Sequence, residues 1–385
     1  MASVLSTIKM KKYSFLFLIV LLFASCSKKA EITVFNNSEI DRVNEMVDIC
    51  LCQLTDFDAA KIVVMDSEGN QVPTQLLYKG DEKPQSLIFP VSLEAGKSTT
   101  FNVEEGIPDS VKAMTTVRYV PERKDDIAWE NNKVAFRMYG PALAAENASN
   151  GVDVWFKRTD ELIMDKWYKN DLAHVSSYHV DNGEGLDCYK VAHTLGAGGV
   201  TIFANDSLYV GNQYDRYKIL DKGPLQSSFV LFYDSIPFGA HILKSEVVVT
   251  LNAYSNLNEV RVIYSGDTTG YQIAAGIFLH DSIQSLNSSK EKGFIGYAEN
   301  FMTDTKNPVP AGRGYTGVVF PGGIAEAKTV SGHALGINNY KTGEEFRYFF
   351  GAGYESGFES DQSWFKYLSD QKIAISQPLD VKIIR

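Results

Sequence analysis

The sequence predicts an all-β protein with a small N-terminal β-sandwich, a larger and mostly antiparallel β domain, and few helices. Most of the chain consists of short segments that alternate or run apolar over strand lengths. Turn-forming sequences such as Ser67–Asn70 separate these segments, and a single segment near the C-terminus has convincing helical spacing. We therefore expect two domains, residues 32–103 and 117–385, joined by the linker Glu104–Asp109.

The N-terminal domain is expected to be a sandwich of about 80 residues, because its strand-like segments recur every 10–15 residues or so. They are Ile32–Asn36, Met46–Leu51, Lys61–Met65 and Ser86–Phe89. No loop of this domain concentrates titratable side chains. We interpret it as a support or binding module.

The larger domain opens with strand-like segments and contains one clear long hairpin. The two arms of the hairpin are Glu246–Tyr254 and Glu259–Tyr264, and their length is typical of large curved sheets. A helix is predicted with Asp361 as its N-cap, because Trp364, Phe365 and Leu368 form one apolar stripe. Further strands are predicted at Val134–Tyr139, Val152–Lys157, Val200–Phe203, Ser228–Tyr233 and Leu379–Ile384.

The N-terminus has the pattern of a bacterial lipoprotein signal peptide. Basic residues precede the apolar run Tyr13–Phe23, which is too short to span a membrane, and Ala24-Ser25-Cys26 follows it. We expect residues 1–26 to direct export, with cleavage before Cys26 and lipidation of that cysteine. This anchor would make the membrane a partner of the protein.

Composition narrows the function further. A net charge of −10 argues against nucleic acid as a partner, because such binding depends on clustered Lys and Arg. Cys50 and Cys52 lie two residues apart, which is a poor geometry for a disulfide within one strand. We interpret them, together with Cys188, as small and mostly buried thiols.

Candidate catalytic residues gather in the stretch His174–Gly199, which holds three of the six histidines. Its glycines would allow the backbone to turn tightly and approach a ligand. Arg137 and Tyr139 are two apart on a predicted strand and therefore share one face of a sheet. We predict a concave site formed by Arg137, Tyr139, His179, Asp187, Tyr189 and His193. The alternative is that this stretch is only a polar connector and that Arg137 forms a structural ion pair.

Two reactions on carbohydrate fit these residues. Hydrolysis of a glycoside needs two carboxyl groups, for which the candidates are Glu130, Asp153, Asp181, Glu184, Asp187 and Glu299. Elimination at a uronic acid needs a cation such as Arg137 and a base such as His179 or His193.

Substrate contacts can also be predicted by residue type. Aromatic side chains match the apolar face of a sugar ring, although several tryptophans are expected in the core. The predicted substrate-binding set is Trp129, Glu130, Trp155, Glu184, Lys190 and Glu299. A Ca²⁺ ion could bind through His179, Asp181 and Asp187, but no standard ligand spacing supports it, so we assign no metal or other cofactor.

The sequence resembles the DUF4861 family over nearly the whole mature chain. The resemblance rests on Val120–Arg123, Asp126–Asn131, Ala135–Ala142, Asp153–Trp155, Tyr178–His179, Asp187–Lys190 and Gly196–Gly199. It implies an exported and often lipid-anchored protein of polysaccharide-degrading bacteria, mostly Bacteroidota. It also implies that the larger domain is a galactose-mutarotase-like supersandwich, a fold that does not fix the reaction.

The family context implies a role beside enzymes that degrade acidic plant and algal glycans. We therefore expect a lipoprotein that cleaves uronic-acid-containing oligosaccharides or polysaccharides, as a hydrolase or a lyase. A sugar mutarotase or epimerase and a non-catalytic glycan-binding lipoprotein are the alternatives. Lipoproteins that these bacteria display on the outer surface usually have an acidic signal just after the cysteine. Here Ser27-Lys28-Lys29 is basic, so we expect the protein to face the periplasm.

Overall fold

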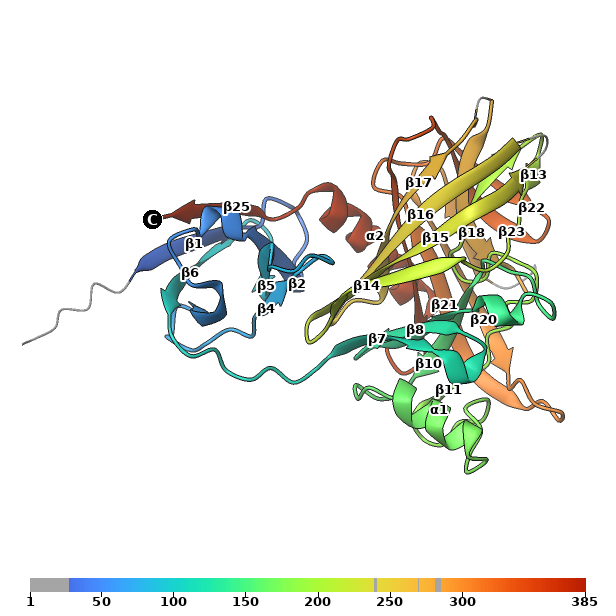
Figure 1. Ribbon diagram of the computed structural model, residues 1–385, viewed down its shortest axis with the longest axis horizontal. Coiled ribbons are helices and arrows are strands. Elements are labelled where there is room, and N and C mark those ends of the chain that lie inside the picture. Colours follow the sequence, from blue (N-terminus) through green and yellow to red (C-terminus); the bar gives the residue numbers. More distant parts are fainter. Residues whose placement is uncertain (1–27, 239–240, 269, 281–284) are drawn as a thin grey trace, which may run out of the picture.

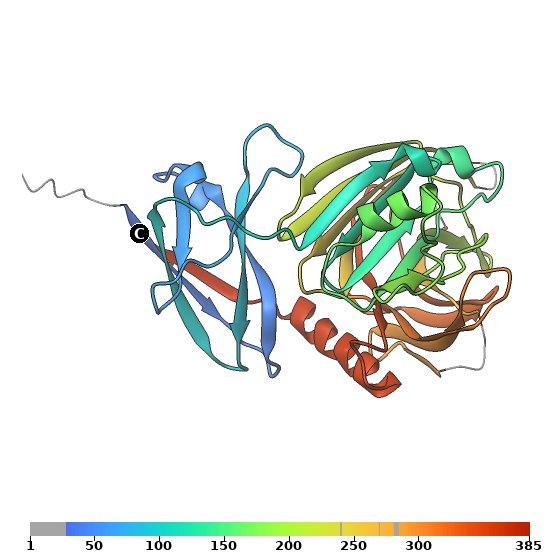
Figure 2. The same ribbon diagram turned by 90° about the horizontal axis from the view of Figure 1, so that it is seen from below.

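The computed structural model describes residues 28–238, 241–268, 270–280 and 285–385. The predicted signal peptide and Cys26 lie outside these residues. Two β domains lie side by side along the long axis of the molecule (Figures 1 and 2). The all-β prediction is confirmed, since only two α-helices are present among the described residues.

The N-terminal domain is a sandwich of two antiparallel sheets that enclose one apolar core. One sheet has the order β25 (Asp380–Ile384), β1 (Lys29–Phe35), β6 (Ser98–Glu105) and β3 (Ile62–Met65). The other has the order β2 (Arg42–Cys50), β5 (Ser86–Leu93) and β4 (Gln75–Leu77).

The C-terminal strand β25 corrects the predicted domain boundary. The sequence placed the strand after Leu379 in the larger domain, but β25 pairs with β1 along the edge of the N-terminal sheet. The two strands lie at opposite ends of the sequence. Their pairing depends on the path of the whole chain, which local periodicity does not encode. The N-terminal domain is therefore completed by the last residues of the protein.

The cysteine prediction is also wrong for one pair. Cys50 ends β2, and the chain then turns through a 3-10 helix at Leu51–Gln53, so Cys52 does not continue the strand. The turn brings the two Cα atoms to 5.2 Å, and Cys50 and Cys52 form a disulfide. Cys188 is a buried free thiol, as expected.

The larger domain packs an eight-stranded antiparallel sheet against two five-stranded sheets (Figure 1). The eight-stranded sheet has the order β14 (Arg216–Lys222), β15 (Gln226–Phe238), β16 (His241–Asn252), β17 (Leu257–Ser265), β24 (Phe346–Tyr354), β21 (Pro310–Val319), β20 (Phe294–Met302) and β19 (Ser285–Ser289). The predicted long hairpin is confirmed as β16 and β17.

The two smaller sheets form the opposite layer. The first has the order β11 (Gly185–Asp187), β10 (Val152–Lys157), β9 (Val134–Met138), β8 (Asp126–Asn131) and β7 (Thr115–Val120). The second has the order β13 (Ser207–Leu208), β12 (Val200–Ala204), β18 (Gln272–Phe278), β23 (His333–Asn339) and β22 (Glu326–Val330). Bonds between Val152 and the segment Leu195–Ala197 join the two sheets at a seam.

Two helices cover outer faces of these sheets (Figure 2). The predicted helix is confirmed as α2 (Asp361–Ser376), with Ser360 as its N-cap rather than Asp361. It approaches β20 and β21 closely because Gly296 and Gly317 have no Cβ to meet Leu368. The other helix, α1 (Met164–Leu172), was not predicted.

One buried arginine of the N-terminal domain binds the C-terminal end of α2. Arg42 donates to the carbonyl oxygens of Ala374 (3.3 Å) and Gln377 (2.6 Å), where a helix leaves its carbonyls unpaired. Asp221 of the larger domain in turn accepts the backbone N–H groups of Tyr78 and Lys79. These bonds tie the two domains together at several points.

Candidate active site

The outward face of the sheet β7–β11 carries a row of buried ionisable side chains. On β9, strand alternation turns Arg137 outward, whereas Phe136 and Met138 point into the core. The neighbouring strands add Asp126, Glu130, Asp153, Lys157 and Asp187 to the same outward face. The helix α1 and the loop that follows it cover this face, so the charges are buried rather than solvated.

Arg137 lies at the centre of this row and is bonded to two carboxyl groups. Its Nε and Nη2 donate to Oδ2 of Asp153 at 2.9 and 2.5 Å, and Nη2 also donates to Oδ2 of Asp187 at 3.1 Å. Nη1 lies 3.8 Å from Oδ2 of Asp126. Only 3% of the Arg137 side chain is exposed.

The buried guanidinium is also surrounded by aromatic rings. It lies 5.0 Å from the ring centre of Tyr139, 5.5 Å from that of Trp155 and 5.8 Å from that of Tyr178. Such cation–π contacts partly replace the lost hydration of the cation. Because Nε and Nη2 of Arg137 are bonded to Asp153 and Asp187, Arg137 forms the structural ion pair that we gave as the alternative to a substrate-binding cation.

The three aspartates around Arg137 all have raised pKa values. Burial raises the pKa of Asp126 to about 6, while the nearby Arg137 and Arg123 oppose the shift. Burial is also the main cause that raises the pKa of Asp153 and of Asp187 to about 7.

Counting charges indicates which carboxyl holds a proton. Two cations, Arg123 and Arg137, face three carboxyl groups, so one negative charge is in excess in a buried site. Asp153 accepts two bonds from Arg137, and Asp126 accepts the N–H of Gly140. Asp187 accepts one bond from Arg137 and has a pKa raised to about 7, which makes it the candidate for the excess proton.

A cavity of about 310 Å³ opens beside this cluster. Its lining residues are Arg123, Arg137, Tyr139, Asn147, His179, Asp187, Tyr189, Lys190, Val191, Ala192 and Asp304. Five of the six predicted catalytic residues therefore meet at one cavity, although they come from separate segments. His193 is the exception, since its Nδ1 bonds to the carbonyl oxygen of Ala148 and its side chain does not line the cavity.

Potential proton-transfer groups line the cavity beside Asp187. His179 places Nδ1 3.1 Å from the backbone oxygen of Asp187 and 3.7 Å from its Oδ2. Burial raises the pKa of Tyr139, and its hydroxyl has no hydrogen bond to any described residue. The hydroxyl of Tyr189 is buried and also lacks a hydrogen-bond partner among the described residues. A ligand or water in the cavity would satisfy these groups.

Arg123 and Asp304 belong to the cavity but were absent from our predicted site. Nε of Arg123 donates to the hydroxyl of Tyr178 at 3.1 Å, and Asp304 pairs with Lys190 at 3.0 Å. Arg123 does fall within a stretch that carries the family resemblance. Asp304 follows β20, and no local pattern marks it.

Several predicted substrate-binding residues do not line the cavity and have structural roles instead. Glu130 pairs with buried Lys157 at 2.9 Å and accepts the N–H groups at the start of α1. Trp129 lies in the core and donates to Asn258. Trp155 is covered by Trp167, Tyr168 and Tyr178, so its face is closed to a sugar.

The remaining predicted residues divide between the cavity and its surroundings. Lys190 lines the cavity. Glu184 instead bonds Lys166 at the outer end of α1. Glu299 accepts from Nδ1 of His280 at 2.8 Å, and His280 also bonds the carbonyl oxygen of Lys190, so this pair supports the cavity wall.

The hypothetical Ca²⁺ ligands do not converge. Asp181 accepts from Arg158 and from the backbone N–H groups of Gly183 and Gly185. Across the part of the chain that the structure describes, no group of three His, Cys, Asp or Glu side chains is arranged to hold a metal ion. We therefore propose no metal site at this cavity.

Fold and site together define a two-domain β protein whose larger domain is a supersandwich with a buried acidic cluster. The chain belongs to the family described as "Domain of unknown function (DUF4861)", which matches residues 34–381. An "Uncharacterized protein P7" of Formosa agariphila is 27% identical over 395 residues, covering 94% of this chain and 96% of its own.

Two solved structures share the fold. They are an α-mannosidase from Enterococcus faecalis V583 (TM-score 0.56, 8% identity) and a glycosyl hydrolase family 38 protein from Enterococcus faecalis (TM-score 0.55, 9% identity). Each match covers 93% of this chain but only 46% and 47% of theirs, respectively. At this identity the likeness establishes a common fold and nothing about the reaction.

Proposed function

We propose that this protein cleaves glycosidic bonds of acidic carbohydrates in the cavity that Asp187 lines. The observation that carries the proposal is a pair of carboxyl groups in contrasting surroundings at one cavity. Asp187 is buried and its pKa is raised to about 7, whereas 45% of the Asp304 side chain is exposed. Glycoside hydrolysis uses such a pair, one as general acid and the other as base or nucleophile.

In this mechanism Asp187 donates its proton to the leaving oxygen, and Arg137 stabilises the carboxylate that remains. Asp304 activates water or attacks the sugar carbon from the other side. Burial of the cluster matters because it keeps a proton on Asp187 near neutral pH. His179, which contacts Asp187, positions that side chain and lines the cavity.

Acidic substrates are favoured by the cations at the cavity. Arg123 and Lys190 line it and are less buried than Arg137, whose donors are already used. A uronate carboxylate would pair with one of them, since Arg and Lys are the usual partners of carboxylates. Arg123 therefore takes the role that we first gave to Arg137.

Elimination is the second candidate, and a specific observation favours it. Tyr139 and His179 line the same cavity, and either could take the C5 proton of a uronic acid while Arg123 stabilises the developing charge. The fold of the two Enterococcus faecalis structures supports a carbohydrate-related function in general, as an analogy.

The deciding experiment incubates wild-type protein and Asp187→Asn with uronic-acid-containing and neutral oligosaccharides. Hydrolysis predicts new reducing ends without ultraviolet absorption, and it predicts that Asp187→Asn loses activity by roughly 10²–10⁴-fold. Elimination predicts an absorbing double bond that depends on Tyr139 or His179. Conversion of free sugar anomers without cleavage would instead indicate a mutarotase or epimerase. Binding of oligosaccharide without any turnover would leave only the glycan-binding alternative.

We also propose that Cys26 anchors the protein to a membrane that faces the periplasm. The proposal rests on the signal-like residues 1–26, which lie outside the described structure. Within the described residues, no helix is long and apolar enough to cross a membrane. Cys26→Ala should release the protein from membranes, and protease shaving of intact cells should leave the wild-type protein intact.

A further inference from the structure

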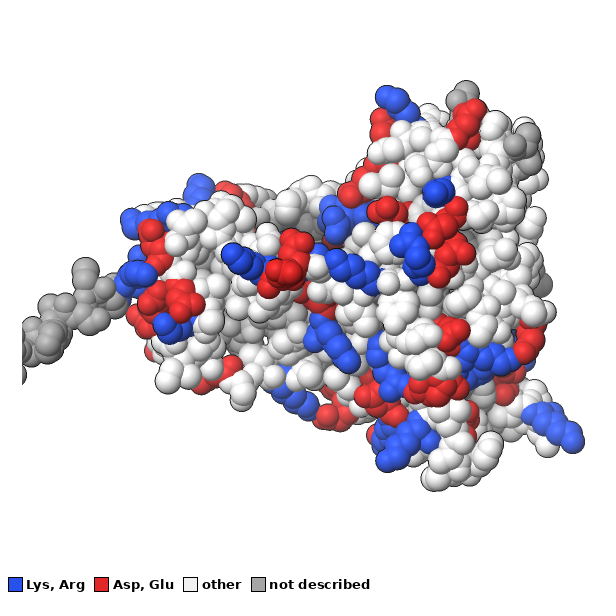
Figure 3. Space-filling model, in the orientation of Figure 1, with Lys and Arg blue, Asp and Glu red and all other residues white. Residues whose placement is uncertain are grey.

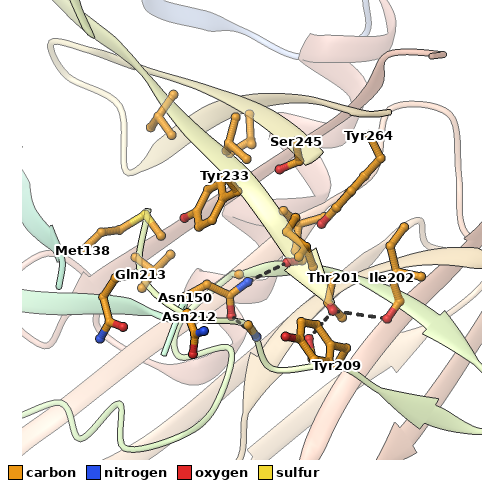
Figure 4. A pocket seen from close by; sticks show the side chains of 18 of the residues that line it. Met138, Asn150, Thr201, Ile202, Tyr209, Asn212, Gln213, Tyr233, Ser245 and Tyr264 are labelled. Atoms are coloured by element: carbon orange, nitrogen blue, oxygen red, sulfur yellow. Dashed lines mark hydrogen bonds between the residues drawn. The ribbon is translucent and has the colours of Figure 1, made fainter. Parts of the chain in front are cut away.

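A second cavity lies on the other side of β9, inside the larger domain (Figure 4). Its volume is about 90 Å³. The inner face of β15, β16, β17 and β24 forms one wall, and β10, β12 and residues 209–215 form the other. Met138 lines this cavity, whereas its neighbours Arg137 and Tyr139 line the charged one.

Three hydroxyl groups of this cavity have no hydrogen-bond partner among the residues that the structure describes. Tyr233, Ser245 and Tyr264 are 8%, 4% and 4% exposed, and none of their side-chain oxygens bonds to a described residue. Figure 4 shows them on the wall opposite Asn150 and Gln213. Buried hydroxyls of this kind require water or a ligand, because losing a hydrogen bond on burial is costly.

Gln213 contributes an unsatisfied acceptor from the opposite wall. Its Nε2 donates to the carbonyl oxygen of Asn147, but its Oε1 is buried without a partner. The Asn150 side chain, in contrast, is fully used, since it donates to Val200 and accepts the N–H of Gly211. Asn150 thereby fixes the segment that carries Gln213. The cavity thus presents an acceptor from one wall and hydroxyls from the other.

The rest of the lining is apolar or neutral. Val152, Val247, Val249 and Phe350 supply apolar surface, and Asp215 is the one charged residue among those that line the cavity. Asp215, Asn212 and Ser235 are exposed and mark the mouth. A lone carboxylate at the mouth disfavours anions. The volume is several times the roughly 10–15 Å³ that one water needs, so a small ring fits.

We propose that this cavity binds a neutral, hydroxyl-bearing ring of monosaccharide size. Its hydroxyl groups bond Tyr233, Ser245, Tyr264 and Gln213, and its C–H face packs on the valines and Phe350. The ring comes either from a free sugar or from the end of a neutral oligosaccharide that enters between Asn212 and Ser235. This inference does not depend on the proposed reaction, because it concerns the opposite face of β9.

The test measures binding to the full chain by saturation-transfer NMR and calorimetry. The probes are glucose, galactose, xylose and rhamnose, their methyl glycosides, a neutral trisaccharide, and glucuronate. We expect at least one neutral sugar to bind in this cavity, with glucuronate clearly weaker at the same cavity. Binding of the methyl glycoside and the trisaccharide as well would identify a glycan end as the occupant, and their exclusion would identify a free sugar.

Variants locate the binding. Tyr264→Phe and Tyr233→Phe each remove one hydroxyl and leave the ring, so each should weaken binding about fivefold, the usual effect of one hydrogen bond. Asp187→Asn, on the other face of β9, should leave this binding unchanged even if it abolishes turnover. Neutral sugars that fail to bind the wild type, or that bind both Phe variants as tightly, would show that the cavity holds only water. Glucuronate binding that is tighter than glucose binding and that both Phe variants weaken would also overturn the proposal, whereas glucuronate bound in the charged cavity should be unaffected by either Phe variant. The two Phe variants act independently, so a folding defect in one leaves the other to decide.

Discussion

The two cavities on either side of β9 show how one strand serves two environments. On the outward side, Arg137 and three aspartates are buried beneath α1, and a charged cavity opens beside them. On the inward side, Met138 and neutral residues of the core surround a second cavity. On the face that Figure 3 shows, Lys and Arg are interspersed with Asp and Glu.

The difference shows what burial does to charged groups on one side of the strand and to neutral polar groups on the other. Both sides hide polar groups from water, which is costly unless they are paired. On the outward side the protein compensates with ion pairs and by holding a proton on Asp187, so burial shifts pKa values. On the inward side burial raises the pKa values of Tyr233 and Tyr264 further, so their hydroxyls stay neutral, and Oε1 of Gln213 is left buried without a hydrogen-bond partner among the described residues. One side is suited to proton transfer and the other to binding.

The largest expected effect is the loss of Arg137. Arg137→Met keeps the stem but leaves Asp153 and Asp187 without their cation, and we expect it to cost about 3–5 kcal/mol in the free energy of unfolding at pH 8. Because burial raises both carboxyl pKa values to about 7, the carboxyls stabilise the fold most when protonated, below their ordinary pKa near 3.8.

The cost of Arg137→Met should therefore shrink as the pH falls from 8 to 4, where the orphaned carboxyls take up protons. Urea unfolding at several pH values measures this. The control is Met138→Leu on the inward side, which conserves volume and should cost less than about 1.5 kcal/mol at every pH. A constant cost of Arg137→Met across this range would contradict a titrating acidic cluster.

The next effect is the pH dependence of turnover. If Asp187 is the general acid, it must be protonated, and the pKa of about 7 places its loss of the proton near neutrality. We expect kcat/KM to fall about tenfold per pH unit above pH 7. Binding in the neutral cavity should show no such dependence. Turnover that rises steadily from pH 7 to 9 would exclude this role for Asp187.

The smallest expected effect concerns His193, which we first placed among the catalytic residues. His193→Ala removes an exposed side chain that bonds only Ala148 among the described residues. We expect less than a twofold change in turnover and about 0.5 kcal/mol or less in stability. A large loss of activity, measured beside His179→Ala, would show that the charged cavity extends further than the structure indicates.

Much of the fold was predictable because strand periodicity is local. Alternation along β9 correctly placed Arg137 and Tyr139 together, and the glycine-rich segment did bring His179, Asp187 and Tyr189 to the same cavity. α1 was missed because its anchor, Glu130, lies on a distant strand. The strand β25 was found but assigned to the wrong domain.

The sequence by itself determined several of the strands, the shared face of Arg137 and Tyr139, and six of the residues that line the charged cavity, namely Arg137, Tyr139, His179, Asp187, Tyr189 and Lys190. Only the tertiary structure decided that Arg137 is bonded to Asp153 and Asp187, and that Asp304 lines the same cavity. It also decided that Glu130 accepts a backbone N–H group at the start of α1. The physical reason is the separation along the sequence between the residues that set each property. The direction of a side chain follows from the two-residue repeat of its own strand. Its partner, and hence its charge and pKa, depends on which distant strands the fold places beside it.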